Sequence, residues 1–158
     1  MPALNFKKQF AAAVQSGKKR QTIRQPRKDG RPHAKVGDQI TLYTGMRTKG
    51  CRKLGVATCT DVQSVKIGEA EFGTSFLDID GQRLSINERC QFAQDDGFGP
   101  NPASALFGFN RFFRDHYGFP FEGVLIKWSA ISSHAPETPP DDVKRDDPQK
   151  TAPDGSMP

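Results

Sequence analysis

Residues 18–24 concentrate the side chains of this chain that are best able to bind an anion. Four of these seven residues are cationic, namely Lys18, Lys19, Arg20 and Arg24. Such a cluster of like charges attracts phosphates through its long-range field. The alternative is a solvated surface segment, which serves only to keep the protein soluble.

The spacing within this segment decides which of its side chains can meet. In a straight strand Thr22 and Arg24 share one face, while Lys19 lies on the other. Lys19 and Thr22 therefore reach one cavity only if the chain turns between them. A helix that ends at Gly17 would supply that turn. Without it, Lys19 faces water.

The positive charge of the chain is concentrated in its first third. The 158 residues carry a net charge of +5, yet residues 1–53 contain most of the Lys and Arg and only two acids, Asp29 and Asp38. Residues 135–158 are rich in proline and acidic side chains and poor in large apolar ones. They cannot bury enough surface to offset the entropy of ordering. We therefore expect one domain over residues 1–134 and a disordered tail over residues 135–158.

Several classes of protein are disfavoured by the composition. The three cysteines form no CxxC pair and the three histidines lie far apart, so we expect neither a disulfide framework nor a metal site, and no cofactor. No apolar run approaches the ~20 residues that span a bilayer, and the first residues lack the apolar stretch of a signal peptide. We expect a cytoplasmic protein that does not enter a membrane.

The order of expected elements is helix, several strands, two helices and a strand. Phe6, Phe10 and Val14 form one face of a short helix, and Ile86 begins the apolar face of another. The remaining expected elements are extended segments at 21–24, 36–45 and 54–65, a hairpin at 76–86 that turns at Asp80-Gly81, helices at 86–94 and 103–117, and a strand at 122–128 with its core at Val124 and Ile126. This order predicts an α+β fold: a small mixed β-barrel with helices packed outside.

Residues 4–130 resemble an ASCH domain of the PUA-like superfamily. The motifs that carry the resemblance are Gly17-Lys18-Lys19-x-x-Thr22-Ile23-Arg24, Val36-Gly37-Asp38, Leu42-Tyr43-Thr44-Gly45, Arg47-Thr48-Lys49, Ala93-x-x-Asp96-Gly97-Phe98, Phe112-Phe113 and Gly123-Val124-Leu125-Ile126-x-Trp128. The resemblance implies a β-barrel with a cleft between barrel and helices, and a role in handling RNA or modified nucleosides.

One ASCH branch consists of small amidohydrolases that cleave acetylated cytidine with a Lys, a Thr and an acidic residue. The resemblance places these roles on Lys19, Thr22 and Asp96, where the family has glutamate in the last position. Glu88 is the alternative acid. Burial or neighbouring cations would lower the pKa of a lysine toward that of a base, which could activate the threonine hydroxyl. Arg24 could then hold the oxyanion, while the acid protonates the leaving amine.

Five further side chains are candidate ligand contacts. Tyr43 could stack on a base, since Trp128 ends an apolar strand and belongs to the core. Arg47 and Lys49, followed by Arg52 and Lys53, form either a phosphate clamp or a solvated loop. Arg20 is grouped with Arg24 as a ligand-binding cation, and Phe98, between two glycines, as a flexible lid.

Three functions remain open at this point. The first is a module that binds RNA, a nucleotide or a nucleobase in a cationic cleft, and the second is an amidohydrolase acting on N-acylated cytidine. The third is a protein-interaction adaptor, for which the tail is the only indication. The second function requires Lys19, Thr22 and Asp96 to converge in one pocket.

Overall fold

The computed structural model describes residues 1–132, so the proposed boundary at 134 and the tail lie outside the described residues. The elements are β1 (Ala3–Phe6), α1 (Lys8–Ser16), β2 (Gln21–Arg24), β3 (Gln39–Thr44), β4 (Arg52–Glu69), a 3-10 turn η1 (Glu71–Gly73), β5 (Ser75–Ile79), β6 (Gln82–Arg83), α2 (Ile86–Asp95), α3 (Pro102–His116) and β7 (Phe121–Trp128). Within this part of the chain, no helix has the length and apolar character that crossing a membrane requires.

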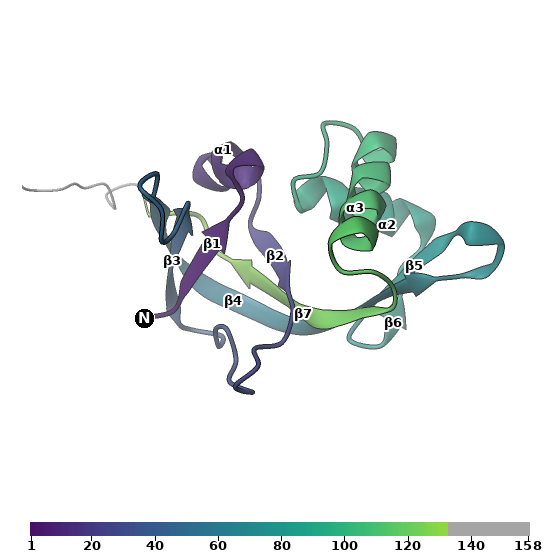
Figure 1. The fold of residues 1–158 in the computed structure, drawn as a ribbon, viewed down its shortest axis with the longest axis horizontal. Helices are drawn as coiled ribbons and strands as arrows, with labels where there is room; N and C mark the ends of the chain where they lie inside the picture. The colour runs from purple at the N-terminus through teal and green to yellow at the C-terminus, as the bar shows by residue number, and fades with distance from the viewer. Residues whose placement is uncertain (133–158) are drawn as a thin grey trace, which may run out of the picture.

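The long strand β4 organises a seven-stranded mixed sheet. Its first half pairs antiparallel with β3, its second half with β7, and its last residues also with β5. β1 extends the sheet by pairing parallel to β3, β6 pairs with β5, and β2 pairs with β7. In Figure 1, β1 and β3 lie at one end of β4, and β5 and β6 at the other.

The predicted α+β class is confirmed, but the predicted small mixed β-barrel is not confirmed, because the sheet formed by residues 1–132 is not closed. A barrel closes only when its terminal strands also pair with each other, whereas β1 pairs with β3 and β2 with β7. A side chain bridges the two strands instead, because Arg24 Nη2 donates a hydrogen bond to the backbone oxygen of Asn5 at 2.6 Å. The sheet thus stays open between β1 and β2, and side chains can line this opening.

The turn after α1 follows the sequence prediction. The helix buries Phe10, Ala11 and Val14, and Gly17 ends it in the left-handed region with φ 86°, as glycine permits. Phe6 was expected on the same helix, but it lies at the end of β1 and is 4% exposed. The reason is that Lys7 is extended (ψ 151°), so the helix begins only after it.

The elements of the second half are also close to those predicted. The hairpin turns at Asp80 and Gly81, both with positive φ. Ile86 is 57% exposed as the first residue of α2, whereas Ala93 near the other end of the helix is buried. In β7 the buried positions include Leu125 next to Ile126, because both faces of this strand are covered.

Helix α3 starts at a side-chain cap that can be tested. Asn101 accepts a hydrogen bond from the backbone N–H of Ser104 at 3.0 Å. Asn101→Ala removes this acceptor and is expected to lower the free energy of unfolding by about 1 kcal/mol in urea denaturation. Asn101→Ser keeps an acceptor in place, so it should stay within a few tenths of a kcal/mol of the parent. Equal losses in the two variants would contradict the capping role.

Candidate functional site

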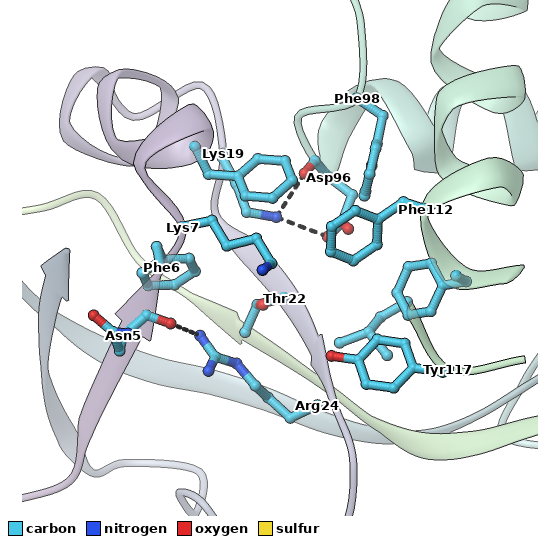
Figure 2. Close-up of a pocket in the computed structure, with 13 residues that line it drawn as sticks. Asn5, Phe6, Lys7, Lys19, Thr22, Arg24, Asp96, Phe98, Phe112 and Tyr117 are labelled. Atoms are coloured by element: carbon cyan, nitrogen blue, oxygen red, sulfur yellow. Dashed lines mark hydrogen bonds and ion pairs between the residues drawn. The ribbon is translucent and has the colours of Figure 1, made fainter. Parts of the chain in front are cut away.

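A cavity of about 250 Å³ lies where the sheet is open. β1 and the start of α1 line one side, the segment after α2 and the helix α3 line the other, and β2 lies between them (Figures 1 and 2). Its polar lining consists of Asn5, Lys7, Lys19, Thr22, Arg24, Asp96 and Tyr117. Its aromatic wall is formed by Phe6, Phe10, Phe98, Phe112 and Phe113. Most of these side chains lie far apart in the sequence.

Lys19 and Asp96 form a buried ion pair in this cavity. Lys19 Nζ lies 3.1 Å from Asp96 Oδ1 and donates a hydrogen bond of 2.6 Å to the backbone oxygen of the same residue. The two residues are only 2% and 3% exposed. The ammonium also lies 4.9 Å from the centre of the Phe10 ring. Figure 2 shows both contacts between Lys19 and Asp96 as dashed lines.

Two glycines allow this pair to form. The left-handed turn at Gly17 redirects the chain, and the N–H of Lys19 then donates to the carbonyl of Ala13 at 2.9 Å. Gly97 follows Asp96 with φ 93°, and a Cβ there would lie 3.2 Å from Lys19 Cδ. Glycine at position 97 therefore provides both the backbone conformation and the space for the lysine side chain.

Burial shifts both members of the pair toward their neutral forms. Desolvation lowers the pKa of Lys19, and the positive charge of Arg24 lowers it further, while Asp96 opposes the shift. Desolvation also raises the pKa of Asp96, against the attraction of Lys19. The two shifts bring the pKa values of the base and the acid closer together, which is a property useful for acid–base chemistry.

Thr22 and Arg24 occupy the same cavity. Thr22 is 7% exposed and lies on β2 between Lys19 and Arg24 (Figure 2). Arg24 is held by its hydrogen bond to Asn5, and its guanidinium lies 5.0 Å from the centre of the Phe6 ring. Desolvation lowers the pKa of Arg24, but a guanidinium stays charged in proteins. The cavity thus combines a hydroxyl, a fixed cation and a buried acid–base pair.

The structure therefore brings together Lys19, Thr22, Arg24 and Asp96, as the sequence hypothesis required. The turn after Gly17 is what places Lys19 and Thr22 on one cavity. Glu88, the alternative acid, is exposed in the first turn of α2 and does not line the cavity. Phe98 does line it, but its ring packs 5.3 Å from the rings of Phe10, Phe109 and Phe112, as core residues do.

Four of the predicted ligand contacts lie outside this cavity. Arg20 is exposed, and its Nε donates to the carbonyl of Gly17. Tyr43 lies on β3, half-buried, and Arg47 and Lys49 are exposed in the loop that follows. A role for these four in binding would involve a ligand that extends beyond the cavity.

Three polar lining residues were missed in the sequence, Asn5, Lys7 and Tyr117. Lys7 lies in the link between β1 and α1, and it was assigned no role because Phe6 was placed on the helix. Tyr117 follows Phe109 and Phe113 at steps of four residues. That spacing would have placed it on the buried face of α3.

Comparisons with known proteins find similarity at the level of structure. No family model and no curated protein sequence matches the chain. Among solved structures, the chain is similar to a crystal structure of a mutant ZmASCH protein from Zymomonas mobilis. The identity is 14%, the match covers 82% of this chain and 67% of that chain, and the TM-score is 0.47.

Proposed function

We propose that this cavity binds a single nucleobase or modified nucleoside. The observation that carries the proposal is the buried Lys19–Asp96 pair, which opens onto a small aromatic-walled cavity beside Arg24. A base offers ring nitrogens, carbonyl oxygens and amino groups in one plane. Such a pattern is matched by cationic donors on one side and a carboxyl group on the other.

The size and walls of the cavity support a small planar ligand. Its volume of about 250 Å³ lies below the range of roughly 300–1,000 Å³ that drug-sized ligands occupy. Stacking on an aromatic side chain contributes about 1–3 kcal/mol per base, and Phe112 and Tyr117 offer ring surface at the cavity (Figure 2). One base fits this description better than a longer stretch of nucleic acid.

Arg24 provides the test of this proposal. Arg24→Gln is expected to weaken the binding of cytidine by about tenfold in isothermal titration calorimetry, because a charge-assisted hydrogen bond contributes about 1.5–3 kcal/mol. The matched control is Arg20→Gln, which removes the same charge from an exposed side chain outside the cavity. Circular dichroism should show that both variants stay folded. Equal affinities in the two variants, or no binding of cytidine by the parent, would overturn the proposal.

A second candidate function is hydrolysis of an N-acylated cytidine. The observation that favours it is the convergence of Lys19 and Asp96, 3.1 Å apart, with the Thr22 hydroxyl in one cavity. In this scheme neutral Lys19 takes the proton of the Thr22 hydroxyl as its oxygen attacks the acyl carbon. Arg24 stabilises the oxyanion. The C–N bond then breaks, and the leaving amine takes a proton from Asp96.

The second half of the reaction would regenerate the enzyme. Water attacks the acyl-threonine ester, and the carboxylate of Asp96 takes the proton of that water. The acid is released and the proton on Lys19 returns to the threonine oxygen. Release of acetate from acetylcytidine separates this function from binding alone, since a binding module would hold the nucleoside unchanged.

A further inference from the structure

A second cavity, of about 420 Å³, adjoins the first. Asn5, Phe6 and Lys7 line both cavities, so the two are separated only by this one stretch of chain. The start of α1 and the loop at 45–52 complete its lining. Figure 2 shows Lys7 extending from this shared wall toward the first cavity.

The loop that lines the second cavity is held in place by its own hydrogen bonds. The carbonyl of Gly45 accepts from both the N–H and the hydroxyl of Thr48, and that hydroxyl in turn accepts from the N–H of Gly50. The N–H of Met46 donates to the side-chain oxygen of Asn5 at 3.0 Å. The loop is therefore tied to the wall that the two cavities share.

The charge lining this cavity is positive and not neutralised. Lys7, Lys8 and Arg52 contribute cations, and none of its lining residues is acidic. In the part of the chain from 1 to 132, none of these three forms an ion pair. Arg52 donates to the neutral amide oxygen of Gln15 at 3.0 Å, which orients the guanidinium without removing its charge. Lys8 and Arg52, together with Lys7 on the wall that both cavities share, favour an anionic guest.

We propose that this second cavity binds the phosphate group of a nucleotide whose base occupies the first cavity. The inference rests on the proposed function, and it narrows the ligand class from a free nucleoside to a nucleotide unit, either alone or within a strand. The shared wall carries the argument, because the phosphate is joined to the base through the sugar, and a sugar lying beside Asn5 and Lys7 would link a base in the first cavity to a phosphate in the second. Arg47 and Lys49, exposed on the same loop, would then face the next phosphate of a strand.

The test compares cytidine, cytidine monophosphates with the phosphate at either end of the sugar, and a cytidine-containing trinucleotide. The variant is Lys8→Gln with Arg52→Gln, two residues that line only the second cavity. The parent should bind at least one phosphate-bearing probe about tenfold more tightly than cytidine. The variant should lose that advantage while its affinity for cytidine stays within about twofold. The matched control, Lys28→Gln with Lys35→Gln, removes the same charge from an exposed loop elsewhere.

The outcomes separate this inference from the proposed function. Tight binding of cytidine with no gain from any phosphate would overturn the phosphate site and leave the base cavity standing. An equal loss in the control variant would also overturn it, since the effect would then come from net charge alone. A phosphate-dependent affinity that the variant abolishes, without binding of cytidine, would support the phosphate site and contradict the base cavity. If only the trinucleotide gains affinity, the ligand is a strand rather than a free nucleotide.

Discussion

Lys19→Met is expected to lower the free energy of unfolding by about 3–5 kcal/mol, because it leaves the Asp96 carboxyl buried without its partner. Methionine keeps the length of the side chain but removes the charge and the two contacts to Asp96. Urea denaturation at neutral pH measures the loss. Lys18→Met, one position earlier and exposed, should change stability by less than about 0.5 kcal/mol.

The double variant Lys19→Met with Asp96→Leu distinguishes two causes of lower stability, the loss of the ion pair and the loss of side-chain packing at the cavity wall. Removing both charges leaves no buried charge without a partner, so the double variant should be more stable than Lys19→Met alone. If the double variant loses the sum of the two single losses, the ion pair is not the source of the effect.

The loss in Lys19→Met should depend on pH in a defined direction. Burial raises the pKa of Asp96 above its value in the unfolded chain, so the folded state binds the proton more tightly. Stability linked to this group is therefore greatest below the unfolded pKa of about 3.9 and falls as the pH rises through the folded pKa. Without Lys19, only the weaker effects of Gln21 and Arg24 still oppose the rise in the Asp96 pKa that burial causes. The deficit of the variant should thus shrink in acid and grow toward neutral pH.

Local turn chemistry made much of the fold predictable. Gly17 after an apolar helical face and Asp80-Gly81 between apolar runs each specify a backbone conformation within a few residues. Closure of the sheet has no such local signature, because it depends on whether β1 and β2 pair across the whole molecule. Phe6 was misplaced for a related reason. Phe6 and Phe10 are four residues apart, as on one face of a helix, and this spacing does not show that the helix begins only at Lys8, after Phe6.

The site was predictable in its residue types but not in its contacts. Lys19 and Asp96 are separated by 77 positions, and they meet where Phe10 of α1 packs against Phe98 and against Phe112 of α3. Strand alternation could not tell whether Tyr43 faces the candidate cavity, since this depends on how β3 packs against its neighbours. In the structure Tyr43 is half-buried and lies outside that cavity. The position of Asp96 rested on a resemblance, and spacing alone could not separate it from Glu88.

Thr22→Val is expected to abolish release of acetate from acetylcytidine if the cavity catalyses that reaction. Valine matches threonine in shape and lacks only the hydroxyl, so binding of the nucleoside should stay within about threefold by calorimetry. Loss of a nucleophile costs on the order of 10⁴-fold or more in kcat. Thr22→Ser, which keeps the hydroxyl, is the matched control. Turnover that survives in Thr22→Val would show that water, not threonine, attacks the acyl carbon.

The pH profile of that reaction tests the acid–base pair itself. In the reactive form, Lys19 is neutral and Asp96 carries the one proton that the two groups share. The lowered pKa of Lys19 and the raised pKa of Asp96 both favour this form. At low pH the pair gains a second proton, so Lys19 can no longer act as the base. At high pH the pair loses its one proton, so Asp96 can no longer act as the acid. The rate should follow a bell whose two limbs belong to the pair as a whole. In Asp96→Asn only Lys19 still titrates, so the residual rate should rise with pH and then level off. A profile with an unchanged alkaline limb in Asp96→Asn would exclude Asp96 as the proton donor.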